Sequence, residues 1–296
     1  MGFVFVIIAV SVNMVKSYGS KRISGRMSDI STAVDVSLFR NLLCAALGAV
    51  IVASMGVNSF ELPPIGWLIC SVAGVAIGLN YVVWVLALKT GVYVFANAAN
   101  TASFMVAAFC GTVFWGEELT LFKGLAIILI LTAMLFMGRY QSEISGKISA
   151  NHVLLLVLVF LSQGLSMTTQ KWFTRELPAV SVNVYTFYAL LISSVLLFIA
   201  TFFISKRPDL KERTARVKGL SGWVAVMAVC FYLVTFFQTK ASALLDTVVT
   251  YPVNNGLALV AGNVMAWTCF SEKPTKNSII GMFLVFSALM FIGLSK

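Results

Sequence analysis

Residues 245–272 read LDTVVTYPVNNGLALVAGNVMAWTCFSE, and residues 90–117 read TGVYVFANAANTASFMVAAFCGTVFWGE. A shift of 155 positions aligns the two segments and places Asn100 on Asn255. Each segment also carries three small residues spaced four apart, which are Ser103, Ala107 and Gly111 in the first and Ala258, Gly262 and Ala266 in the second. Such a stripe lets two helix backbones approach closely inside a bilayer. The two segments therefore predict equivalent membrane helices in an internal repeat.

The composition of the chain indicates a membrane protein. Of its 296 residues, 59% are hydrophobic and only 11% are charged, whereas about a quarter of the residues in a soluble domain are charged. The formal net charge is +10, but the basic residues lie between apolar runs. There they are typical of topology signals and of contacts with anionic lipid, and not of a nucleic-acid-binding surface. We expect membrane lipid as a partner and no nucleic acid.

Ten apolar runs are long enough to cross a bilayer, which takes about 17 to 25 helical residues. They cover residues 2–18, 35–56, 65–88, 92–115, 120–138, 152–172, 181–204, 220–240, 246–270 and 277–294. The first run has no basic segment before it and no small-residue cleavage site, so we interpret it as a retained helix. The sequence predicts an all-α polytopic membrane protein with ten transmembrane helices.

The repeat extends beyond these two segments. The same shift aligns Ser11 and Lys16 with Ser166 and Lys171. We therefore predict two five-helix copies, residues 1–140 and 152–296, joined by a linker at 141–151. Because five is odd, the second copy enters the membrane from the opposite side, and the two copies are inverted.

The charges of the loops agree with inverted copies. The loop after the second helix has no Lys or Arg, whereas the corresponding loop after the seventh has six, namely Lys206, Arg207, Lys211, Arg213, Arg216 and Lys218. Loops after the odd-numbered helices hold fourteen basic residues in all. By the positive-inside rule these loops are cytoplasmic and both termini face outward. No Asn-x-Ser/Thr sequon occurs, which favours a bacterial protein of the inner membrane.

This arrangement resembles the drug/metabolite transporter superfamily, in its ten-helix EamA-like branch. The residues that carry the resemblance are Arg40, Glu117 and Gly124 in the first copy, and Pro252 in TYPVNN, Glu272 and Gly281 in the second. Asn97 stands where the second copy has Pro252, and the family commonly keeps both termini in the cytoplasm, in contrast to the charge pattern here. The resemblance implies a secondary transporter whose first, third, fourth, sixth, eighth and ninth helices surround the pathway.

Transport requires a polar cavity near the midplane and some irregular helix. Pro252 cannot donate to the carbonyl of Val248, so it predicts a helix kink. The amides in both repeated segments either line the cavity or hydrogen-bond between helices as packing contacts. The candidate substrate-binding residues are Asn13, Asn80, Trp84, Asn97, Asn100, Gln163, Ser166, Lys171, Tyr232, Lys240, Tyr251, Asn254 and Asn255.

The charged residues restrict the substrate. Lys16, Lys171 and Lys240 lie toward helix ends, where they either extend to lipid headgroups or, for Lys171 and Lys240, contact an anionic substrate. Every acidic residue falls in a loop or at a helix end, and only Asp246 could approach the pathway. An exporter that exchanges protons for cationic drugs needs a buried carboxylate, so we expect a neutral, zwitterionic or anionic metabolite. We expect Glu117 and Glu272 to stabilise the N-termini of the helices that follow them.

The most direct interpretation is a secondary transporter working by alternating access, as an exporter or exchanger. The alternatives are an importer, a non-transporting sensor or scaffold, and a membrane-embedded enzyme. An enzyme would need clustered carboxylates or histidines, but the acidic residues are scattered and His152 is the only histidine. We therefore expect no catalytic residues, metal or cofactor. The apolar helices at 120–138 and 277–294 belong at the periphery and could form a homodimer interface.

Overall fold

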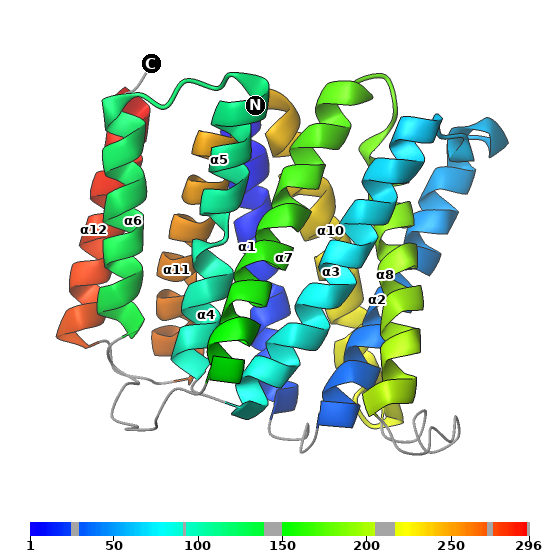
Figure 1. Cartoon of the computed structure of the whole chain (residues 1–296). Coiled ribbons are helices and arrows are strands. Elements are labelled where there is room, and N and C mark those ends of the chain that lie inside the picture. The colour runs from blue at the N-terminus through cyan, green and yellow to red at the C-terminus, as the bar shows by residue number, and fades with distance from the viewer. Residues whose placement is uncertain (25–29, 91–92, 139–149, 205–216, 271–274, 295–296) are drawn as a thin grey trace.

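The computed structural model describes residues 1–24, 30–90, 93–138, 150–204, 217–270 and 275–294. In these residues the regular structure is helical, and the helices stand side by side as a bundle (Figure 1). Helices in the first predicted copy are α1 (Gly2–Ser24), α2 (Ile30–Ser54), α3 (Pro64–Thr90), α4 (Tyr93–Ala102), α5 (Phe104–Trp115) and α6 (Leu121–Gly138), with a 3₁₀ turn η1 (Val57–Phe60). Those of the second are α7 (Ala150–Glu176), α8 (Val182–Ile204), α10 (Ser221–Leu244), α11 (Thr247–Phe270) and α12 (Lys276–Leu294).

Eight spans in the described residues are long and apolar enough to cross a membrane, and α4 and α5 together supply one of them. The chain is thus an all-α, multi-pass integral membrane protein, as predicted. Both termini lie at one end of the bundle, here called the termini end (Figure 1). At the other end, here called the opposite end, α1, α3 and α8 finish. The predicted linker at 141–151 falls almost wholly outside the described residues.

Helix α11 is not among the eight spans, which are selected by length and hydropathy. The burial of its polar residues explains how it is stable in a membrane protein. Ten consecutive residues, from Thr247 to Gly256, are buried. A helix that is buried on every side is packed within the protein, and its polar groups find protein partners instead of lipid. The first half of α11 therefore lies inside the bundle, where its amides can serve a site, whereas Val264 and Trp267 in the second half are exposed.

The segment that the repeat aligns with α11 is irregular. The expected single helix at 92–115 is divided at Ser103, between α4 and α5, and the Ser103 hydroxyl donates to the carbonyl of Asn100 at 2.6 Å. Helix α11 is assigned as one helix through Pro252. The hydroxyl bond turns a side chain onto the preceding turn, which is a recognised cause of helix bending. The kink at Pro252 stays a prediction.

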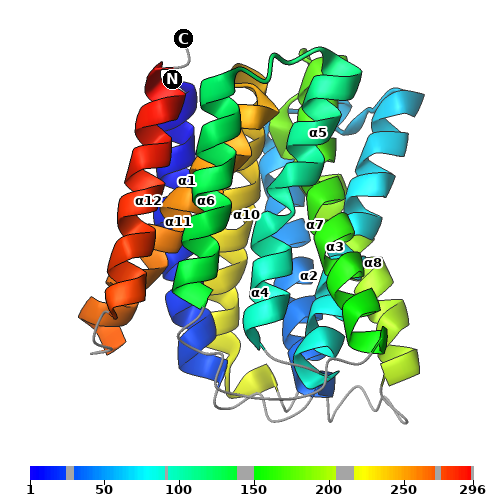
Figure 2. The same cartoon turned by 60° about the vertical axis from the view of Figure 1, so that its left-hand side comes forward.

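Close pairs of helices build the bundle. The most extensive contacts join α1 with α10, α2 with α8, α3 with α7 and α3 with α8. Helix α6 pairs with α12, and the two form one edge of the bundle in both views (Figures 1 and 2). Their outer surface carries exposed apolar side chains such as Ile128 and Phe283. The peripheral position agrees with the sequence prediction, and the homodimer stays a prediction.

Gly74 allows α3 and α8 to pack closely. A Cβ atom on Gly74 would lie 2.9 Å from the backbone oxygen of Ala189 and 2.5 Å from the Cβ atom of Ile192. We expect Gly74→Leu to destabilise the protein by about 1–3 kcal/mol or more, because overpacking forces the two backbones apart. The measurement is the melting temperature (Tm) of the purified protein in detergent. Gly222→Leu is the control, because a Cβ atom there meets nothing within 4 Å; equal losses in both variants would contradict the prediction.

Candidate functional site

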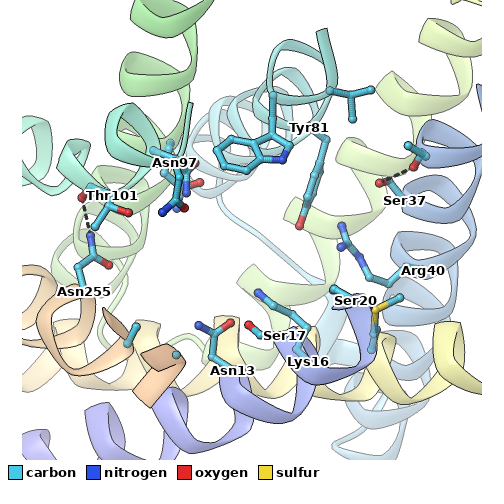
Figure 3. A pocket seen from close by; sticks show the side chains of 18 of the residues that line it. Asn13, Lys16, Ser17, Ser20, Ser37, Arg40, Tyr81, Asn97, Thr101 and Asn255 are labelled. Atoms are coloured by element: carbon cyan, nitrogen blue, oxygen red, sulfur yellow. Dashed lines mark hydrogen bonds between the residues drawn. The ribbon is translucent and has the colours of Figure 1, made fainter. Parts of the chain in front are cut away.

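A cavity of about 620 Å³ lies between α1, α2, α3, α4, α7, α10 and α11 (Figure 3). About half of its lining comes from residues 13–23 of α1, 33–40 of α2 and 81–85 of α3. These segments all belong to the half of the bundle nearer the opposite end. The volume lies within the usual range for small-molecule sites. The bundle therefore holds a ligand-sized space displaced toward the end away from the termini.

Six of the predicted site residues line this cavity. They are Asn13, Trp84, Asn97, Asn100, Gln163 and Asn255. Asn255 donates from Nδ2 to the carbonyl of Thr101 at 2.8 Å, which joins α11 to α4 beside the space (Figure 3). Amides have both donors and acceptors, so this part of the wall can bind a hydroxyl, carbonyl or amine of a ligand. The structure thus brings together the aligned pair, Asn100 and Asn255.

The other predicted residues do not line the cavity, and three of them, Asn80, Tyr232 and Tyr251, hydrogen-bond from one helix to another. Asn80 donates to the carbonyl of Val159 at 3.2 Å and to Ser162 Oγ at 3.2 Å. Tyr251 donates to the carbonyl of Met167 at 2.5 Å. The remainder are Ser166, Lys171, Lys240 and Asn254. For Asn80 the packing alternative describes the geometry better.

The cavity also holds two cations that were not among the predicted site residues. Lys16 of α1 and Arg40 of α2 both line it, and Figure 3 shows their charged groups directed into the space. Arg40 donates from Nε and Nη2 to Asn41 Oδ1 at 3.3 and 3.1 Å, and its guanidinium lies 4.3 Å from the centroid of Tyr81. Lys16 could have been found from the sequence, because it aligns with the candidate Lys171.

At the termini end, Glu117 corrects a prediction. Its Oε2 accepts from the backbone N–H of Thr247 at 2.6 Å, from the Thr247 hydroxyl at 2.5 Å and from the N–H of Val248 at 3.3 Å. Glu117 therefore caps the N-terminus of α11, not that of α6, the helix that follows it. Its Oε1 lies 3.4 Å from Lys171 Nζ, and that ammonium donates to the carbonyl of Leu245 at 2.8 Å. These contacts tie α5, α7 and α11 together. Glu272 lies outside the described residues.

The acidic side chains of the described residues stay away from the cavity lining. Asp246 pairs with Lys123 at 3.2 Å near the termini end and is 48% exposed. Asp35 is buried within α2, because this helix begins at Ile30, earlier than expected. The described cavity wall therefore carries positive charge that no carboxylate in the wall balances. In the described residues no three His, Cys, Asp or Glu residues are grouped as metal ligands would be.

No family model matches the sequence, and no curated protein matches it significantly. Solved structures do match. One of them, described as the crystal structure of a protein, is similar with a TM-score of 0.76 and 12% sequence identity, covering 100% of this chain and 99% of that chain. At this identity the likeness shows the fold alone. The whole chain thus has a fold that occurs in a solved structure.

Proposed function

We propose that this chain is a secondary transporter of a small organic metabolite that works by alternating access. The expected substrate is neutral, zwitterionic or anionic, and the expected direction is export or exchange. We place the chain in the ten-helix EamA-like branch of the drug/metabolite transporter superfamily, as two inverted five-helix copies. The site in this proposal is the cavity between α1, α2, α3, α4, α7, α10 and α11.

The observation that carries the proposal is a polar cavity inside an apolar bundle. Asn13, Asn97, Asn100, Gln163 and Asn255 place amides around a space of about 620 Å³. Polar groups in a membrane protein face a partner or a water-filled space, and at a cavity they mark a substrate pathway. The network of Glu117 with Thr247 and Lys171 lies at the termini end. A cavity displaced to one end, with packed contacts at the other, is what one state of an alternating-access cycle requires.

Helix packing supports the inverted repeat. If α1 to α3 correspond to α7, α8 and α10, then the contact of α1 with α10 corresponds to that of α7 with α3, and both are among the most extensive. Likewise α1 contacts α11, as α7 contacts α4 and α5. Exchange of equivalent helices about a two-fold axis in the membrane plane produces such pairs. The cycle would then exchange the conformations of the two copies.

The charges favour a cavity that faces the cytoplasm. The fourteen basic loop residues of the sequence follow helices that end at the opposite end; among the described residues that end carries Lys21, Arg22, Lys218 and Lys276, and the termini end carries Lys123, Lys171, Arg175 and Lys240. Most of the basic loop residues, such as Lys206 and Arg207, lie outside the described residues. By the positive-inside rule the opposite end is cytoplasmic. In this orientation the structure is inward-facing.

A ligand screen followed by transport tests the proposal. Purified protein is heated with amino acids, organic acids, sugar phosphates, nucleosides and quaternary amines, because a ligand stabilises the folded state by RT ln(1 + [L]/Kd). We expect a rise in Tm with one neutral, zwitterionic or anionic class, and counterflow of the same compound in proteoliposomes. Binding without counterflow would indicate a sensor instead. A rise with quaternary amines alone would contradict the expected substrate class.

A further inference from the structure

Lys16 and Arg40 stand out in the cavity because, in the part of the chain that the structure describes, no ion pair with an acidic side chain involves either of them. The ion pairs found in the described residues join Lys123 with Asp246 and Lys171 with Glu117, and neither involves a cation of the cavity. Only 8% of the surface of Arg40 is exposed. Unpaired cations within a transmembrane bundle are costly and mark substrate or ion pathways. The described wall supplies no counter-charge for them, so a solvent ion or a ligand can provide it.

Both cations lie against the same aromatic ring. The Arg40 guanidinium is 4.6 Å and the Lys16 ammonium 5.3 Å from the centroid of Phe231. Tyr81 contacts Arg40 as well, at 4.3 Å. Aromatic faces stabilise a cation without neutralising it. The two positive charges therefore stay close together, and an anion between them would relieve their mutual repulsion.

Arg40 is also held in one orientation. Its Nε and Nη2 donate to Asn41 Oδ1, and Asn41 in turn donates from Nδ2 to Ser193 Oγ at 3.0 Å. None of these bonds uses Nη1. A guanidinium fixed by its partners loses little entropy when it binds an oxyanion, and it binds carboxylate or phosphate oxygens with directed N–H groups. This arrangement is that of a prepared anion site.

From this geometry we infer that Lys16 and Arg40 form an anion subsite, so that the substrate is an organic anion with a carboxylate or phosphate group. The group binds between α1 and α2, and the uncharged body of the substrate extends to the amides Asn97 and Asn255 on the other side of the cavity (Figure 3). Asn100 also lines the cavity. The inference rests on the proposed function and narrows its substrate class. A net cationic substrate would meet two like charges with no carboxylate in the described wall.

Matched ligand pairs test the inference with the full chain in detergent. The probes are L-malate with its uncharged diamide, and glycerol 3-phosphate with glycerol. We expect an anion to raise the Tm and its uncharged counterpart to have no effect; the malate and phosphate arms distinguish carboxylate from phosphate. In Lys16→Met and in Arg40→Met the affinity should fall about tenfold or more, the loss expected for a charge-assisted hydrogen bond.

Stability without ligand separates a binding role from a structural one. If Lys16 serves binding, Lys16→Met removes a repulsive charge, and the Tm without ligand stays the same or rises. A drop in that Tm would indicate a structural role and overturn the inference. Lys218→Gln is the control, because it removes one positive charge from an exposed position outside the cavity; its affinity for the anion should be unchanged.

The outcomes separate this inference from the proposed function. Uncharged or zwitterionic compounds that bind and undergo counterflow equally well in Lys16→Met and Arg40→Met would overturn the anion subsite and leave the transporter intact. If no compound of any charge class binds or undergoes counterflow, both are overturned. Lys16→Arg should retain anion binding, because it keeps the positive charge. If Lys16→Arg lost anion binding while Lys16→Met still bound the anion as the parent protein does, the subsite would also be contradicted.

Discussion

Glu117→Gln is expected to destabilise the protein by about 3–5 kcal/mol, the usual result of removing one partner from a buried ion pair. The Glu117 side chain is only 4% exposed and lies 3.4 Å from Lys171 Nζ. Glutamine keeps the shape but removes the counter-charge of Lys171. It also removes the anion that faces the positive N-terminus of α11, where Thr247 and Val248 donate. Thermal unfolding in detergent measures the effect.

Two further variants isolate this effect. Glu118→Gln changes the neighbouring carboxylate, which is exposed, and should change stability by about 0.5 kcal/mol or less. The double variant Glu117→Gln with Lys171→Met should recover part of the loss, because neither charge is then left unpaired. A similar Tm for Glu117→Gln and Glu118→Gln would show that the network at the termini end contributes little.

The same variant bears on the transport cycle. If the Glu117 network holds the termini end closed, weakening it should admit reagents to the cavity from that end. We expect a cysteine at Thr101, a cavity residue, to be labelled from the termini side in Glu117→Gln and not in the parent protein. The background must lack the five native cysteines, two of which are not buried. Equal labelling in both proteins would place the barrier elsewhere.

The helical class could be predicted because membrane insertion depends on the hydrophobicity of consecutive residues, which is visible in the sequence. A run of apolar residues has a favourable transfer free energy wherever the helix packs, so most spans were found within a few residues. The start of α2 shows the limit. Thr32 and Asp35 are polar and were placed at or before the helix start, yet both are buried against protein. Hydropathy assumes a lipid environment, and these residues do not face lipid.

The contacts of the site could be predicted only in part, because they depend on how helices far apart in the sequence pack against one another. Lys16 and Lys171 align in the repeat, yet Lys16 faces the cavity and Lys171 pairs with Glu117. Two equivalent residues thus have different surroundings, which no alignment of the copies reveals. The capping of Thr247 by Glu117 joins residues 130 positions apart, whereas the local rule assigned this carboxylate to the next helix.

The small-residue stripes illustrate the same asymmetry. In the first copy Gly111 is closely packed, because an added Cβ atom would collide with Thr247 and Glu117. In the second copy Ala258 and Gly262 line the cavity, and an added Cβ atom on Gly262 meets nothing within 4 Å. The expected close helix contact therefore does not occur at Gly262 in this structure. The stripe instead leaves room beside α11.

Because a Cβ atom on Gly262 has open space beside it, a large side chain at this position is expected to fill the cavity and block transport. We expect Gly262→Trp to fold normally and to reduce transport about tenfold or more. The indole would enter the cavity of about 620 Å³ and occupy part of the volume that the substrate needs. The side chain would also have to be accommodated whenever the opposite end closes, so both binding and the conformational change are opposed. Counterflow in proteoliposomes measures transport, and the Tm reports folding.

The comparison with Gly293→Trp decides whether the cavity is the pathway. Gly293 lies on α12, does not line the cavity, and an added Cβ atom there also meets nothing within 4 Å. Both variants introduce the same side chain at a position where a Cβ atom has open space. The relevant difference is that Gly262 lines the cavity and Gly293 does not. Normal transport by Gly293→Trp with loss in Gly262→Trp is the expected result. Full transport by a folded Gly262→Trp would mean that the substrate crosses by another route, since an indole in the pathway must compete with it for the same volume.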